Sequence, residues 1–302
     1  MVAGQARRIM LVHAHPDDEV LTTGGTIAKA TESGDLVTLV TCTLGEEGEI
    51  LLPEIEHLAA DREGGLAEHR QQELAASMAA LGVTDSRILG GTGRFRDSGM
   101  MGEPSNDRSE CFWRADLREA ADVLVPVIRE VRPHVLITYD DFGGYGHPDH
   151  IQAHRVAMYA ASLAAVSGYR PDMGEAWDIP RILWTALPVS AIRRGIEALR
   201  EVGDDSDFAA MDPDDIPFAA PDDLIDLGID VTSQLDAKVA AMRAHASQIS
   251  LDKGFFALSN NYGVPIFGTE YFLIAKGPTP LSRDSAGDVF AGLTDAQLSD
   301  SH

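Results

Sequence analysis

Short apolar runs alternate with segments of helical periodicity over the first 170 residues of the chain. In chain order we expect a strand-like run at Arg8–Val12, a helix at Thr26–Ser33, a strand at Leu36–Thr43, a helix at Glu68–Leu81, an apolar run from Arg87 to Leu89, a helix at Arg114–Val131 and a strand at His134–Tyr139. Pro126 marks a kink or a boundary in the last of these helices. The alternation predicts an α/β fold with a mostly parallel, Rossmann-like sheet and helices on both of its faces.

The second half of the chain is less regular. We expect residues 1–170 to form the main part and residues 171–302 a smaller C-terminal part that packs on it and closes a pocket, within one integrated domain. The elements expected there are a strand at Arg181–Leu187, a helix at Val189–Val202, a helix at Ser233–Ile249 and a strand at Thr269–Ala275. The stretch from Asp204 to Asp226 holds nine Asp, three Pro and no basic residue, which predicts a loop or flap. The tail after Lys276 is expected to be frayed.

Composition narrows the classes of partner. The formal net charge is −24, and no run rich in Lys or Arg stands out, so nucleic acid and anionic membranes are not expected partners. No stretch is apolar for long enough to span a membrane, and the first apolar run is too brief for a signal peptide, so we expect a cytoplasmic protein. Cys42 and Cys111 are expected to be reduced packing residues.

Two clusters of titratable residues follow predicted strands. His13-Ala14-His15-Pro16-Asp17-Asp18-Glu19 follows the first strand, and Tyr145-Gly146-His147-Pro148-Asp149-His150 follows the strand that ends at Tyr139. In an open parallel sheet, ligands bind outside the carboxyl ends of the strands, so both clusters should face one crevice. Two imidazoles and a carboxylate meeting there could hold a catalytic zinc with a position open for water. A spare carboxylate of the Asp17-Asp18 pair could take the proton of that water.

The residues alone leave alternatives open. Either His-Pro-Asp motif taken singly could be a turn in which an Asp caps the next helix, although two such motifs at equivalent strand ends argue against this interpretation. His154 lies four residues after His150 on a predicted helix, and spacing permits either as a ligand. A nucleotide-binding or glycosyl-transfer enzyme is a rival from another class, but Arg96 stands where the third glycine of a GxGxxG fingerprint would follow Gly91 and Gly93. A sugar-binding relative without catalysis would be expected to lack Asp17 or a ligand.

The motifs AHPDDE and GHPDH resemble the LmbE-like (PIG-L) family of metal-dependent N-deacetylases, which includes the deacetylase of glycosylphosphatidylinositol synthesis. The stretches TCTLGEEGEI, GGTGRFRDSGM, RPHVLITYDDFGGYGHPDH and ALSNN are similar to the mycothiol-pathway branch of that family. This resemblance implies hydrolysis of the N-acetyl group of an N-acetylglucosaminyl-inositol with release of acetate. The alternatives are cleavage of mycothiol S-conjugates and deacetylation of another N-acetylglucosamine conjugate. It also implies one Zn²⁺ per chain, with Fe²⁺ as the alternative in the cell, and a small-molecule substrate. The oligomeric state is not predicted.

The resemblance also implies roles for individual residues. In the family, the residues matching His15, Asp18 and His150 bind the metal, and the residue matching Asp17 is the general base. The resemblance further implies that His147 stabilises the charged intermediate and assists the leaving amine. It implies that Tyr145 polarises the carbonyl and that Asp149 orients a histidine. It assigns substrate contacts to Glu49, Arg70 and Asp97, with Asn261 as a further pocket residue, and places Thr22 where the related amidase usually carries Lys. Without the resemblance, Arg70 reads as a solvated helix charge, Glu49 as loop surface and Asn261 as a turn residue.

Overall fold

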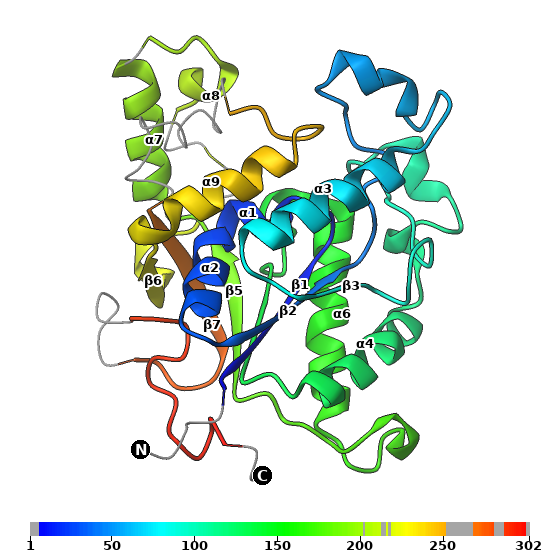
Figure 1. Ribbon diagram of the computed structural model, residues 1–302, viewed down its shortest axis with the longest axis vertical. Helices are drawn as coiled ribbons and strands as arrows, with labels where there is room; N and C mark the ends of the chain where they lie inside the picture. The colour runs from blue at the N-terminus through cyan, green and yellow to red at the C-terminus, as the bar shows by residue number, and fades with distance from the viewer. Residues whose placement is uncertain are drawn as a thin grey trace.

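The computed structural model describes residues 6–201, 203–212, 216, 219–251, 268–280 and 287–299. The strands of this part of the chain form one seven-stranded sheet in the order β3-β2-β1-β4-β5-β7-β6 (Figure 1). Their bounds are β1 Arg8–His13, β2 Leu36–Thr41, β3 Asp85–Ile88, β4 Val135–Thr138, β5 Arg181–Ala186, β6 Leu227–Asp230 and β7 Thr269–Lys276. The α-helices are α1 Asp18–Thr22, α2 Gly24–Glu32, α3 Leu66–Ala80, α4 Leu117–Val131, α5 Gly143–Gly146, α6 Pro148–Ala164, α7 Val189–Glu201, α8 Asp207–Ala210 and α9 Leu235–Ala244.

The sheet is mostly parallel, as the alternating pattern predicted. Strands β3, β2, β1, β4 and β5 run parallel, and β7 runs antiparallel to its neighbours β5 and β6. In the centre, Leu11 of β1 lies opposite Leu39 of β2 and Ile137 of β4. Neighbouring parallel strands therefore end at the same edge, which places the loops after β1 and β4 side by side.

Side chains of β1 point alternately to two cores. Ile9 and Leu11 pack in a cluster with residues of α2, α3 and α9, whereas Met10 and Val12 pack in a second cluster with residues of α4 and α6. Helices thus cover both faces of the sheet (Figure 1). Both clusters are fully buried along the central strands, so the sheet is a rigid base for the loops at its carboxyl edge.

Helix α4 differs from its sequence expectation at two points. It begins at Leu117 rather than Arg114, because the Asp116 carboxylate accepts hydrogen bonds from the amides of Arg118 and Glu119 and so caps the helix. Pro126 lies inside α4 and does not end it. The apolar face of the helix, packed closely against α6, keeps it continuous across the missing hydrogen bond.

Helix α9 ends at Ala244, five residues before the predicted end at Ile249. The chain turns there because side chains of other helices bind the next residues. His245 Nε2 donates to Glu19, and the amide and hydroxyl of Ser247 donate to Glu73 at 2.8 and 2.6 Å. These contacts, distant in sequence, replace the helical hydrogen bonds that the periodic pattern predicted.

The Asp-rich segment after Asp204 is more ordered than a loop. Its described residues include α8 and a short 3-10 helix at Asp222–Leu224, and Ile216 packs against Ile192 and Ile196 of α7. Strand β6 follows at once and pairs with β7, a pairing that its four residues do not signal by themselves.

The prediction of a frayed tail is wrong for residues 287–299. Val289 and Phe290 are buried, and the Arg181 guanidinium donates to the carbonyls of Val289 and Ala291, each at 2.8 Å. Asp288 also pairs with Arg7 at 2.6 Å. Long-range contacts hold this segment against the amino-terminal edge of the sheet. Among the described residues, no helix is both long enough and apolar enough to cross a membrane.

Candidate metal centre and active site

The two predicted clusters meet at the carboxyl edge of the sheet. The loop after β1 carries His15 and Asp17 and leads to Asp18 at the start of α1, and the loop after β4 leads to His147 and His150 at the start of α6. The ring centroid of His15 lies 4.6 Å from that of His147 and 5.2 Å from that of His150. Residues more than 100 positions apart in the sequence therefore share one small volume.

Three donor groups in this volume lie at equal spacing. His15 Nδ1 is 3.3 Å from His150 Nε2 and 3.4 Å from Asp18 Oδ2, and His150 Nε2 is 3.2 Å from Asp18 Oδ1. A tetrahedral ion with bonds of about 2.0–2.1 Å separates its ligand atoms by about 3.3–3.4 Å. Each of the three distances matches this spacing, and the two imidazoles face different oxygens of the Asp18 carboxylate.

The outer hydrogen bonds fix the ring orientations that a metal requires. His150 Nδ1 lies 3.1 Å from the Gly143 carbonyl, which can only accept, so Nδ1 carries the proton and Nε2 presents a lone pair. His15 Nε2 lies 3.3 Å from Asp149 Oδ2 and 3.4 Å from Asp97 Oδ1, so Nε2 carries a proton and Nδ1 is the nitrogen that can bind a metal once it is deprotonated. His15 Nδ1 and His150 Nε2 both face Asp18.

The protonation states of His150 and Asp18 favour binding of a cation. Burial lowers the pKa of His150 to about 4, although the Asp18 charge opposes this shift. Burial opposes ionisation of Asp18, but the charges of His150 and His15 hold the pKa of its carboxyl well below the usual range. At neutral pH His150 is therefore a neutral imidazole and Asp18 an ionised carboxylate, which are the forms that bind metal. Burial opposes protonation of His15, but the Asp97 charge and the hydrogen bonds to Asp149 and Asp18 raise the pKa of His15 well above its usual value, so this ring releases a proton when a cation binds.

Ligand atoms also lie within 4.8 Å of one another in two other groups, His15 with His147 and His150, and His15 with Asp97 and Asp149. The second of these groups shares only His15 with the donor group. Its carboxylates are already occupied: Asp149 accepts from the amide of Ser98 at 2.8 Å and from the Ser98 hydroxyl, and Asp97 accepts from the amides of Gly99 and Glu47 at 2.9 and 3.0 Å. These carboxylates form a layer behind His15 rather than a competing site.

Asp17 lies beside the donor group in an unusual backbone conformation. Its φ is 110°, in a region that favours glycine and costs other residues about 1–3 kcal/mol. The Asp17 amide donates to Glu19 Oε2 at 2.9 Å, and its carboxylate lies 3.3 Å from Arg70 Nη2. Burial and the neighbouring Asp18 charge raise the pKa of Asp17 to about 6, against the opposing charge of Arg70. Such a carboxylate can take and return a proton near neutral pH.

Arg70 is not the solvated helix charge that composition alone suggested. Its side chain is 3% exposed, and it donates to the carbonyls of Gly45, at 2.9 Å, and Pro16. A Cβ at Gly45 would stand 1.8 Å from Arg70 Nη1, so only glycine permits this approach. Arg70 thus braces the loop that carries Asp17.

His147 and Tyr145 lie on the other side of the donor group. His147 Nδ1 accepts from the Asp149 amide at 3.1 Å, and burial, together with the charges of His15 and His150, lowers the pKa of His147 to about 2. The ring is therefore neutral and carries its proton on Nε2. The Tyr145 ring lies 5.0 Å from His150 and is half exposed.

The structure separates His150 from its alternative, His154. One turn further along α6, His154 Nδ1 contacts the Tyr139 carbonyl at 2.9 Å, and its ring packs edge-on against Trp184. Glu49 is exposed on its loop, where its carbonyl accepts from Gln248 at 3.1 Å. The predicted pocket residue Asn261 lies outside the described residues.

A cavity of about 680 Å³ opens beside the donor group. Asp18, Thr22 and Tyr145 line it on one side, and Trp184, Tyr271 and Leu273 line it on the other. Residues after position 170 therefore supply part of the wall of this cavity. Mostly apolar walls with a few polar groups at one end are typical of small-molecule sites.

Sequence reasoning missed Glu19 and its partners. Glu19 Oε1 accepts from Ser77 at 2.8 Å and from His245 at 2.7 Å, and all three residues are fully buried. Glu19 closes the first motif, and a buried carboxylate beside a candidate base could have drawn attention to it. Ser77 and His245 stand in ordinary helical patterns and give no such signal.

Comparison with known proteins adds independent findings. Residues 10–161 match the family model PIG-L, described as GlcNAc-PI de-N-acetylase. The chain is 54% identical over 289 residues to a 1D-myo-inositol 2-acetamido-2-deoxy-alpha-D-glucopyranoside deacetylase from Geodermatophilus obscurus, covering 95% of this chain and 98% of that protein. It is 57% identical over 298 residues to the protein of the same name from a Nocardioides species, covering 95% of this chain and 99% of that protein.

Solved structures share the fold at much lower identity. The N,N'-diacetylchitobiose deacetylase from Pyrococcus horikoshii superimposes with a TM-score of 0.61 at 20% identity, covering 92% of this chain and 88% of that one. This likeness concerns the fold alone. The family model and the full-length relatives together are decisive: the chain belongs to the PIG-L family.

Proposed function

We propose that the protein is a metal-dependent N-deacetylase that acts on 1D-myo-inositol 2-acetamido-2-deoxy-α-D-glucopyranoside in mycothiol biosynthesis, releasing acetate and the free amine. One observation carries this proposal: two imidazole nitrogens and a carboxylate lie at tetrahedral spacing with Asp17 beside them. The relatives that bear this substrate in their names are more than half identical over nearly the full chain, which supports the choice of substrate.

His15, Asp18 and His150 would hold one Zn²⁺ per chain, with Fe²⁺ as the alternative in the cell. The two tautomers and the ionised Asp18 support this ligand set. A bound divalent ion supplies two kinds of chemistry, polarisation of the amide carbonyl and acidification of the attacking water. Asp149 orients His15 by accepting its Nε2 proton.

Asp17 is the general base in this proposal. Its carboxylate takes a proton from the attacking water, and its raised pKa suits both the acceptance of that proton and its transfer to the leaving amine. The ion pair with Arg70 holds one oxygen of this carboxylate in place. Amide hydrolysis requires both proton transfers, because the amine is a poor leaving group until it is protonated.

His147 and Tyr145 stabilise the oxygen that becomes negative. The Asp149 amide fixes the His147 tautomer with the proton on Nε2, so the neutral ring donates a hydrogen bond without carrying charge. This tautomer supports a role for His147 in steadying the charged intermediate. The Tyr145 hydroxyl would donate to the same oxygen, and its ring contact with His150 supports this placement.

The substrate's sugar hydroxyls would meet Glu49, Arg70, Asp97, Thr22 and Asn261. Thr22 lines the cavity, and the charged groups of Arg70 and Asp97 lie 3.3 Å from Asp17 and 3.4 Å from His15, respectively. The substrate is a small polar molecule. We propose that the protein binds it in the cytoplasm and has no nucleic acid or membrane partner. The net charge of −24 supports this view.

Metal removal and return test the proposal. Chelated protein should lose release of acetate from the inositol glycoside and regain it with Zn²⁺ or Fe²⁺, whereas turnover indifferent to chelation would refute a metal mechanism. Asp17→Asn should bind metal as the wild type does and lose most turnover. Rates on a mycothiol S-conjugate, measured beside those on the acetylated glycoside, distinguish the deacetylase from the amidase.

A further inference from the structure

The Glu19 carboxylate joins three separate segments behind the candidate base. Its Oε2 accepts from the Asp17 amide at 2.9 Å, on the loop after β1. Its Oε1 accepts from the Ser77 hydroxyl of α3 at 2.8 Å and from His245 Nε2, just after α9, at 2.7 Å. Glu19, Ser77 and His245 are each 0% exposed. None of these three residues lies among the metal donors.

The backbone of Asp17 depends on this carboxylate. A φ of 110° is unfavourable for an aspartate, so surrounding contacts must hold it. Arg70 binds the Asp17 side chain and the Pro16 carbonyl, and Glu19 binds the Asp17 amide. Asp18 is held separately, because its Oδ2 accepts from the amide of His15 at 2.8 Å. The Asp18 side chain thus has a hydrogen bond that does not pass through Glu19.

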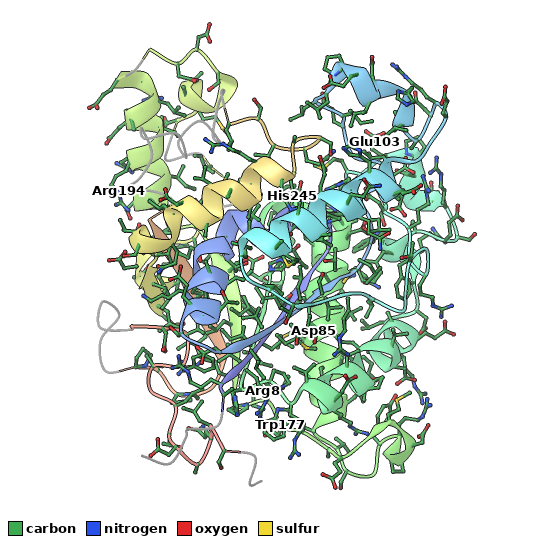
Figure 2. The ribbon with its side chains drawn as sticks, in the orientation of Figure 1. Arg8, Asp85, Glu103, Trp177, Arg194 and His245 are labelled. Atoms are coloured by element: carbon green, nitrogen blue, oxygen red, sulfur yellow. The ribbon has the colours of Figure 1, made fainter. Side chains whose placement is uncertain are left out.

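His245 is itself firmly placed. It lies at the end of α9, where this helix passes α1 and α3 (Figure 2). Two residues on, Ser247 donates twice to Glu73, and its carbonyl accepts from the Leu51 amide at 2.9 Å. Ser247 thus anchors the turn after α9 to α3 and to the backbone at Leu51. Among the described residues, Glu19 is the hydrogen-bond partner of the His245 ring, whose Nδ1 has none.

We propose that His245 is a positioning residue for the deacetylation: through Glu19 it holds the amide of Asp17, and with it the carboxylate that takes the proton from water. The proposal rests on the proposed function, since it takes Asp17 as the base. Without the His245 donor, the Glu19 carboxylate turns in its pocket and releases the Asp17 amide. A displacement of about 1 Å at a reacting group costs up to about a hundredfold in rate.

Two substitutions at position 245 test this role. His245→Leu fills a similar volume without a donor and should lower kcat between about tenfold and a hundredfold, with KM and bound metal unchanged. His245→Gln can place an amide N–H near Glu19 and should restore most of the loss. In a Glu19→Gln background, His245→Leu should cause little further loss, because both changes act on one contact. Ser77→Ala, a milder change, should lower kcat in the same direction.

Ser247→Ala is the matched control, since it removes a hydroxyl from the same turn that donates to Glu73 and not to Glu19. It should lower the melting temperature and leave kcat unchanged. The proposal is overturned if His245→Leu keeps wild-type kcat, if it changes metal content or KM instead, or if Ser247→Ala lowers kcat equally. A wild-type protein that releases no acetate would refute the proposed function instead, so the two failures are distinguishable.

Discussion

His15 Nε2 lies 3.3 Å from Asp149 Oδ2, on the opposite side of the ring from the Nδ1 atom that faces His150. One imidazole therefore connects a buried carboxylate to the donor group. Asp149 is fixed in turn by the amide and hydroxyl of Ser98. The orientation of a metal-facing nitrogen is thus set by a loop that follows β3, outside both sequence motifs.

Replacing this carboxylate should weaken metal binding. In Asp149→Asn the side chain loses its charge and can present N–H to His15, which favours the wrong tautomer. We expect a loss of about 10–100-fold in Zn²⁺ affinity, measured by competition with a chelating dye. Asp140→Asn changes a carboxylate on the nearby loop that caps Gly144 instead, and it should bind Zn²⁺ nearly as the wild type does. Equal affinities for Asp149→Asn and the wild type would contradict the orienting role.

The acid limb of kcat/KM should follow ionisation of Asp17. Burial raises the pKa of Asp17 to about 6, and Arg70 opposes that rise. A base works only when ionised, so activity falls as the pH drops through the pKa. The positive charge of a bound metal moves the acid limb to lower pH. Removing a nearby cationic side chain must move the limb to higher pH. Arg70→Gln should therefore shift the limb to higher pH, and an unmoved or lowered limb would argue against Asp17 as the base.

Alanine substitutions at two glycines distinguish the effect of a steric clash from the effect of backbone strain. Gly45 and Gly91 have φ values of 66° and 90°, but a Cβ at Gly45 would strike Arg70, whereas one at Gly91 meets no described atom within 4 Å. Gly91→Ala should cost about 1–3 kcal/mol of stability and keep full turnover. Gly45→Ala should lower kcat as well, because Arg70 must move away from Asp17. Denaturant melts and initial rates on both proteins provide the comparison.

Lys238 and Glu270 form a buried ion pair that links α9 to β7. Lys238 Nζ lies 2.7 Å from Glu270 Oε1, and Glu270 also accepts from the amides of Gly25 and Thr26 at the start of α2. Lys238→Met leaves a buried carboxylate without its cation and should destabilise the fold by about 3–5 kcal/mol. Lys29→Met, which removes a surface contact to the Asp230 carbonyl, should cost about 1 kcal/mol or less. Similar losses in both proteins would disprove the importance of the buried pair.

The strand-end rule predicted where the two motifs meet, because it depends only on the order and direction of β1 and β4. The strand-end rule could not choose between His150 and His154, because both lie on the same helix four residues apart. That choice depends on which carbonyl each ring meets, Gly143 for His150 and Tyr139 for His154. Loop geometry of this kind is absent from residue spacing.

Local patterns also failed where distant side chains decide the backbone. The early end of α9 depends on Glu19 and Glu73, and the ordered segment at 287–299 depends on Arg181 and Arg7. Each contact joins residues far apart in the sequence, so no window of neighbouring residues contains the information. Predictions were most accurate for β1, β2 and β4, whose apolar runs are buried on both faces, and poorer for β3, which is polar and only partly buried.

The position of β7 in the sheet has a consequence for biosynthesis on the ribosome. This last strand of the described chain lies between β5 and β6, both of which are made earlier. Until Thr269–Lys276 has left the ribosome, β6 has no partner in the sheet and β5 exposes an unpaired edge. The donor group, complete by residue 150, can be translated long before Tyr271 and Leu273 are available to line the cavity. The nascent chain therefore carries the residues of the donor group before it has a finished pocket, and its unpaired strand edge is open to pairing with other chains during that interval.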